Sequence, residues 1–293
     1  MKKTLTILFC LFTITIFGQT NQSFSLKWKI GENEKINYLT AMSDIDTSSV
    51  DINFGNFFKS LSDKSGKGLS EAKDFFNKLN ESYKNIDFIT TLTNKGNGIV
   101  DIVMETRPKE DSPEKESDKK NTKEDEMQKM MQKMTQGVML RGSVYENGGV
   151  HSFWVKTGQK NLISIFFELP KKEVKVGDTW QLDVNLIEND QNFICDSAYK
   201  INEVTLTEIK KVNEETIAVL KYNIVEYVKG TFNTPSYMGS GSQVTMMSFS
   251  HQAIAEFSID KGRWISYNGI MSLDTSSGVM TGKKKTKFTL ITQ

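Results

Sequence analysis

The chain has 293 residues and a formal net charge of +1, with 37 lysines and arginines against 36 aspartates and glutamates. This balance lacks the basic excess that nucleic acids or anionic membrane surfaces attract, so it excludes both as the main partner. Two histidines and two cysteines are too few for a zinc cluster, and we expect neither a metal nor a cofactor.

The N-terminus has the order of a secretory signal peptide. Lys2 and Lys3 precede an apolar run, Leu5 to Phe17, which is shorter than the roughly 20 residues that a membrane-spanning helix needs. We expect residues 1–18 to be cleaved near Gly18–Gln19 and the protein to be exported. The absence of a separate C-terminal sorting domain favours the periplasm over the extracellular space, and no later segment is apolar enough to span a membrane.

Residues 19–168 are predicted to form a first antiparallel β-meander that contains inserted helices. In the segment 54–83 the apolar spacing is helical, with one stripe formed by Ala72, Phe75, Phe76, Leu79 and Tyr83. Residues 107–126 are almost entirely charged and hold no apolar side chain, which predicts a disordered, solvated loop.

A second inserted helix is predicted at 122–136, where a capping-box pattern precedes four methionines at helical spacing: Met127, Met130, Met131 and Met134. These methionines are our candidates for the lining of a ligand groove. Three interpretations stay open: the side chains fill gaps against the sheet, they form a mobile hydrophobic lid, or their thioethers bind Cu(I).

Residues 169–293 are predicted to form a second meander of half-buried antiparallel strands. Apolar residues alternate with polar ones in three sets: Ala218, Leu220, Tyr222, Ile224 and Val228; Phe249, Ala253, Ala255, Phe257 and Ile259; and Ile265, Tyr267, Met271 and Leu273. Turn residues at 94–98, 146–149 and 260–263 predict hairpins. Cys195, the one cysteine after the signal peptide, is expected to be a small buried residue, with an intermolecular thiol as the alternative.

The two halves line up in order. The segments 29–38, 93–104, 142–153 and 161–169 match 175–184, 210–221, 256–267 and 286–293, which predicts an internal duplication. In this comparison "LP" at Leu169–Pro170 ends the last strand of the first copy, and "KVGDTW" at 175–180 opens the second with a turn and a core tryptophan. The overall fold class is mainly β with a few helices, as two related meanders in curled sheets or a partly open barrel.

The stretch "LPKKEVKVGDTW" resembles a segment of a Bacteroidota family of exported proteins that is catalogued as a domain of unknown function. The resemblance covers roughly residues 28–290, with its distinctive part at 169–180. It implies export and a β-rich fold, and it carries over no catalytic residue. The predicted shape is also similar to periplasmic lipoprotein carriers, a likeness of fold that says little about function.

No constellation of catalytic residues stands out. His151 and His251 fall on different strands, no Gly-x-Ser-x-Gly elbow is present, and the acidic run 44–51 lacks the glycine and glutamate of a calcium loop. The leading hypothesis is therefore a non-enzymatic protein that binds an apolar ligand, a lipid, a peptide or an envelope protein. The alternatives are a hydrolase that uses His151 or His251 with an acidic partner, and a purely structural envelope component.

Overall fold

The computed structural model describes residues 22–45, 50–52, 86–109, 137–154, 157–187, 192–234, 241–277 and 280–293. The expected signal peptide at 1–18, the helical inserts at 54–83 and 122–136, and the charged loop beyond residue 109 lie outside these residues.

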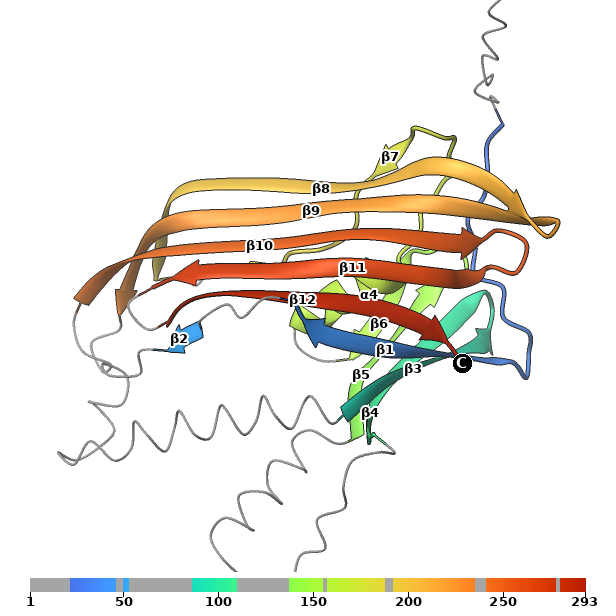
Figure 1. Cartoon of the computed structure of the whole chain (residues 1–293), viewed down its shortest axis with the longest axis horizontal. Coiled ribbons are helices and arrows are strands. Elements are labelled where there is room, and N and C mark those ends of the chain that lie inside the picture. The colour runs from blue at the N-terminus through green and yellow to red at the C-terminus, as the bar shows by residue number, and fades with distance from the viewer. Residues whose placement is uncertain are drawn as a thin grey trace, which may run out of the picture.

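A single antiparallel sheet contains every described strand (Figure 1). In spatial order the strands are β6 (Val150–Trp154), β5 (Gly137–Tyr145), β4 (Ile99–Pro108), β3 (Ile86–Gly96), β1 (Lys35–Asp44), β12 (Met280–Thr292), β11 (Arg263–Ser276), β10 (Gly241–Ser258), β9 (Glu215–Thr234), β8 (Phe193–Val212) and β7 (Thr179–Trp180). The short β2 (Val50–Ile52) also pairs with β12. The terminal strands β6 and β7 do not pair with each other, so the sheet is open rather than closed into a barrel. The mainly β fold class is confirmed.

The sheet consists of two up-and-down series, which meet where β1 pairs with β12. Strands β1, β3, β4, β5 and β6 follow one another on one side, and β12 to β8 do so on the other. The hairpins that the two halves were expected to share, β3–β4 with β8–β9 and β5–β6 with β10–β11, occur in the same order. Duplication itself stays a hypothesis.

The predicted correspondence between the last two segments is wrong. Residues 161–169 do not form a strand: the helix α4 (Thr157–Phe167) occupies most of them, whereas 286–293 belongs to β12. A short apolar run does not distinguish a buried strand from a buried helix by its pattern alone. The run is apolar because α4 is surrounded by protein, with Ile163, Ile165 and Phe167 all buried.

The expected turns are confirmed. Gly96, Asn97 and Gly98 have positive φ between β3 and β4, Gly148 has φ 87° between β5 and β6, and Gly262 has φ 61° between β10 and β11. Gly148 also has no room for a side chain, because a Cβ there would lie 2.3–2.5 Å from atoms of Leu169. The turn thereby fixes the chain just after α4.

Helix α4 is held at its C-terminal end by two buried tryptophans. The Nε1 of Trp28 donates to the Phe167 carbonyl at 3.0 Å, and the Nε1 of Trp264 donates to the Phe166 carbonyl at 2.7 Å. The last carbonyls of a helix have no partner within it, so these indoles satisfy groups that would otherwise be buried unpaired. The indole rings also contact each other edge to face at 5.9 Å.

The segment 169–187 runs from α4 back to the sheet. Val174 forms an isolated bridge with Phe24, and the Asp178 carboxylate accepts from the Lys175 backbone N–H at 2.8 Å in the predicted Gly-Asp turn. Leu182 and Val184 are buried as expected, whereas Trp180 is half-buried. This segment is therefore architectural.

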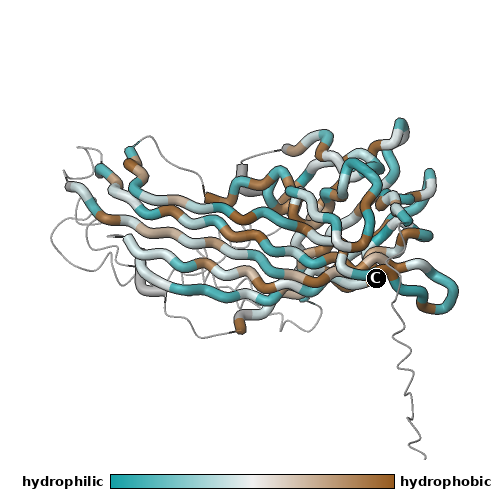
Figure 2. Tube along the Cα trace, turned by 90° about the horizontal axis from the view of Figure 1, so that it is seen from above, coloured by the Kyte–Doolittle hydropathy of each residue, from teal (hydrophilic) through white to brown (hydrophobic). Residues whose placement is uncertain are grey.

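The long strands extend past the core. At about 3.3 Å per residue the 20 residues of β8 span roughly 65 Å, and Figure 2 shows β8–β12 continuing away from the end where other segments crowd together. Cys195 lies in this extension and is exposed, so the expectation that it is buried is wrong. Ile265 is also exposed, because a bulge opposite Glu256 and Phe257 shifts it out of the Tyr267 register.

Candidate functional site

The face of the long strands that carries α4 forms the candidate site. Residues directly opposite each other on neighbouring strands project to the same face. His251 is buried beside Phe166 of α4, and its partners Ile224 and Met271 therefore share that inner face. Phe249, two residues before His251, lies on it as well.

Beyond α4 the inward positions of β10 and β11 remain apolar, with Glu226 of β9 opposite Phe249 and Lys284 of β12 opposite Leu273 at their two sides. Phe166 covers His251 and Phe288, with ring centroids 6.2 Å away in each case. The next positions along β10 and β11, which we call the inner floor, are Met247, Phe249, Met271 and Leu273. Three of them are half-buried and Leu273 is 36% exposed, so the described chain leaves this apolar surface partly open.

A segment without strand pairing borders the inner floor. We call residues 182–187 the strap. Asn202 of β8 binds it at Leu182, accepting from the Leu182 N–H at 3.0 Å and donating to the Leu182 carbonyl at 2.7 Å. Asn161 of α4 makes the same two-bond contact with Asn185, at 2.9 and 2.6 Å. Side-chain amides thus replace the ladder that a neighbouring strand would provide.

Two buried carboxylates also hold the strap. Glu226 of β9 accepts from the N–H groups of Leu186 and Ile187 at 2.8 and 2.9 Å, and its other oxygen lies 2.7 Å from the Lys200 ammonium. Glu168, just after α4, accepts from the Asp183 N–H at 2.8 Å. Burial raises the pKa of the Glu168 carboxyl, although the Asp183 hydrogen bond acts in the opposite direction.

His251 sits in a packed aromatic cluster below the inner floor. Its ring stacks on Tyr267 at 5.9 Å, its Nε2 lies 2.6 Å from the Tyr267 hydroxyl, and it is fully buried. Burial lowers the pKa of His251 to about 4, so the ring is neutral at neutral pH. Gly269 permits this arrangement, because a Cβ there would lie 2.8 Å from the imidazole. The geometry gives His251 a packing role.

His151 occupies a different place, at the β5–β6 edge of the sheet. Its Nδ1 lies 2.9 Å from the Ser143 hydroxyl, which in turn lies 2.6 Å from the Ser152 hydroxyl. Within the described ranges no carboxylate lies within hydrogen-bond distance of either histidine. A serine–histidine contact exists, but the acidic partner that the hydrolase alternative requires is not found there.

The strap and its buried carboxylates were not predicted. One signal was present: Glu226 falls in the inward register of β9, between Ile224 and Val228, where the pattern otherwise calls for apolar residues. An ionisable residue at an inward position needs a buried partner, and the strap amides supply it. Asn202 gave the same signal on β8, where it shares the inward register with Val204 and Leu206, whereas Asn161 of α4 leaves no such pattern.

The predicted groove residues Met127, Met130, Met131 and Met134 lie outside the described residues, so their placement stays a prediction. Over the part of the chain that the structure describes, no three side chains of histidine, cysteine, aspartate or glutamate gather closely enough to hold a metal ion. Nor does any described helix have both the length and the apolar character needed to cross a membrane.

Comparisons with known proteins assign no family to the chain. No protein-family model, no curated protein and no solved structure matches it. The resemblance of 169–180 to a Bacteroidota family therefore stays a prediction.

Proposed function

We propose that this protein is an exported, non-enzymatic binding protein that takes an apolar ligand on the inner floor. The observation that carries the proposal is the partly open row of Met247, Phe249, Met271 and Leu273 beyond α4. Apolar side chains that project inward on a curved sheet normally have core against them, and a partly open apolar row indicates a binding surface.

The surroundings of the inner floor support a preformed site. Helix α4 closes one end through Phe166, and the strap lines the β8–β9 side with Leu186 and Ile187 anchored by Glu226. The Trp28 and Trp264 indoles hold α4, and side chains of β8, β9 and α4 hold the strap. A ligand would therefore meet walls that are already in place, which lowers the entropic cost of binding.

The ligand class follows from the floor itself. Thioethers and a phenyl ring adapt to flexible hydrocarbon better than to a rigid polar solute. The row follows the strand direction, and neighbouring residues on one face of a strand are spaced by about 7 Å. An elongated hydrocarbon chain fits such a track better than a compact molecule does.

A pair of variants on one strand tests the proposal. Phe249→Glu places a charge on the inner floor, whereas Val244→Glu places the same charge on the outer face of β10, where Val244 is 65% exposed. We expect purified, delipidated protein to bind the fluorescent fatty acid parinaric acid. Phe249→Glu should weaken that binding at least tenfold, and Val244→Glu should change it less than twofold.

Circular dichroism must first show that both variants keep the fold. If folded Phe249→Glu binds parinaric acid as tightly as the unmodified protein, the inner floor is not the site. If the unmodified protein binds no parinaric acid at all, the proposed function itself fails.

A further inference from the structure

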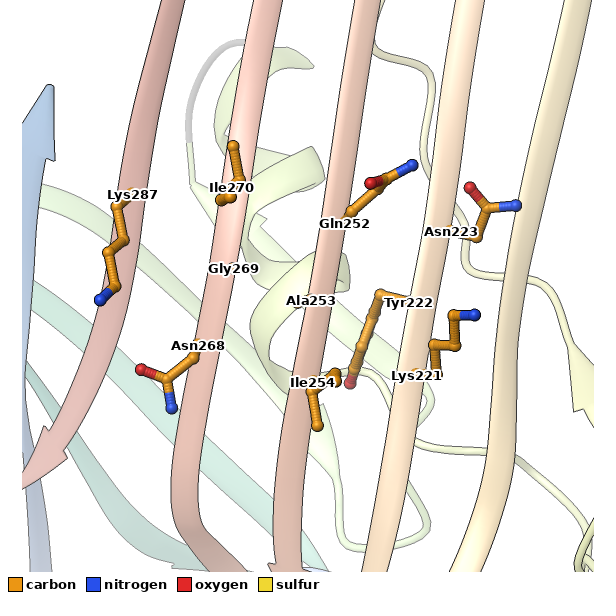
Figure 3. A pocket seen from close by; sticks show the side chains of 10 residues that line it. All are labelled: Lys221, Tyr222, Asn223, Gln252, Ala253, Ile254, Asn268, Gly269, Ile270 and Lys287. Atoms are coloured by element: carbon orange, nitrogen blue, oxygen red, sulfur yellow. The ribbon is translucent and has the colours of Figure 1, made fainter. Parts of the chain in front are cut away.

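The outer face of the long strands carries a separate hollow of about 600 Å³ (Figure 3). Gln252 and Ile254 of β10 alternate with His251 and Ala253, which face the core, so they project away from α4. In Figure 3 the helix lies behind the strands that carry the labelled side chains. The hollow is therefore on the opposite face from the inner floor.

The floor of the hollow is apolar and its rim is rich in amides. Ile254 and Ile270 are 57% and 43% exposed, and the cross-strand register places Gln252 directly between Asn223 and Ile270. Within the described residues, neither the Asn223 nor the Gln252 amide has a hydrogen-bond partner. A free amide both donates and accepts hydrogen bonds, which is the complement of a hydroxyl group.

Two lysines stand at opposite sides of the hollow. Lys221 belongs to β9 and Lys287 to β12, three strand spacings away, or about 14 Å across the sheet. Among the described residues neither ammonium has an ion-pair partner. The residues that line the hollow include these two lysines and no carboxylate, so the lining has a net positive charge. In the row that contains Asn223, the nearest carboxylate is that of Glu203, opposite Asn223 on β8.

We propose that this hollow binds an acidic oligosaccharide. Sugar hydroxyls would pair with the free amides, the C–H face of the ring would lie on Ile254 and Ile270, and carboxylates would reach Lys221 and Lys287. The hollow contains no arginine fork for bidentate phosphate binding and no exposed aromatic ring on which a base could stack. Its recessed shape also suits an inserted ligand better than a flat membrane surface.

An aromatic pair extends the same face along the strands. Tyr227 lies four residues beyond Asn223 on β9, and its ring stacks on that of Tyr199 at 5.1 Å. Tyr199 is 53% exposed, and Lys229, two residues beyond Tyr227, adds another cation to this face. A saccharide longer than the hollow would meet further C–H contacts and charge in this direction.

Isothermal titration calorimetry at low ionic strength tests the proposal with a galacturonic acid trimer and its fully methyl-esterified counterpart. The purified protein should bind the acid at least tenfold more tightly than the ester. The double variant Lys221→Gln/Lys287→Gln should lose at least tenfold in affinity. The control Lys210→Gln/Lys283→Gln removes two lysines of the same face that already pair with Glu256 and Asp274 at 2.6 and 2.8 Å, and it should bind as the unmodified protein does.

Three outcomes would overturn the proposal. The acid trimer produces no binding heat at millimolar concentration, or the Lys221/Lys287 double variant binds it unchanged. In the third outcome, the unmodified protein co-sediments with phosphatidylglycerol vesicles, the Lys221/Lys287 double variant does not, and the trimer does not bind. That result would assign the hollow to a membrane surface. None of these results depends on the inner floor, because the two sites lie on opposite faces of the sheet.

Discussion

The strap is the feature whose energetics the structure defines most sharply, and Asn202→Ala tests it. This change removes both hydrogen bonds to Leu182 and leaves the Leu182 backbone N–H without a partner, whereas the Leu182 carbonyl still accepts from the Val184 N–H at 3.0 Å. Leu182 is 4% exposed, so water cannot easily replace the lost contacts. A buried N–H left unpaired costs about 1–3 kcal/mol, so we expect a loss of about 1–3 kcal/mol in the free energy of unfolding.

Urea unfolding followed by tryptophan fluorescence measures this loss, because Trp28 and Trp264 are buried against α4. The matched control is Asn223→Ala on the adjacent strand, whose amide makes no hydrogen bond among the described residues and which should cost less than about 0.5 kcal/mol. Hydrogen exchange of residues 182–187 should also accelerate in Asn202→Ala alone. Equal stabilities for the two variants, or unchanged exchange in the strap, would refute the reasoning.

Three further predictions concern burial and backbone space. The His251 pKa of about 4 keeps the ring neutral in the folded state, whereas the ring in the unfolded chain protonates below pH 6.5. The free energy of unfolding should therefore decrease by about 2–3 kcal/mol as the pH is lowered from 7 to 4.5, and urea titrations of His251→Phe should show a much smaller decrease. Because the pKa of Glu168 is raised in the folded state, the free energy of unfolding should decrease as the pH rises above 4.5. Glu168→Gln keeps an acceptor for the Asp183 N–H and should be more stable than the unmodified protein at pH 7.5; a less stable variant would contradict this. Gly148→Ala should melt far below Gly96→Ala, because both have positive φ but only the former Cβ collides with Leu169; similar melting temperatures would show that the turn yields.

The strands and their turns were predictable because their causes are local. Alternation placed Ala218, Leu220, Tyr222 and Ile224 on one face of β9, and all four are buried. Glycine and asparagine marked the hairpins, since positive φ is easiest for those residues. The register failed at Ile265, where a bulge inserts one residue and reverses the alternation.

Helix α4 and the candidate site depend on contacts between distant parts of the chain. The run that forms α4 is apolar because protein surrounds it, which is also what a central strand looks like. The partners Asn202 and Leu182 are 20 residues apart in sequence, and Glu226 binds a strap about 40 residues before it. No periodicity encodes such pairs. The inward position of Glu226 was the one readable sign that something polar had to lie against β9.

Mass spectrometry of an organic extract of the purified protein tests whether the inner floor holds an apolar ligand. We expect a reproducible species with a long hydrocarbon chain to co-purify with the unmodified protein and with Val244→Glu, and to be lost from folded Phe249→Glu. An extract that is empty in all three proteins, or a species retained equally by Phe249→Glu, would contradict the claim.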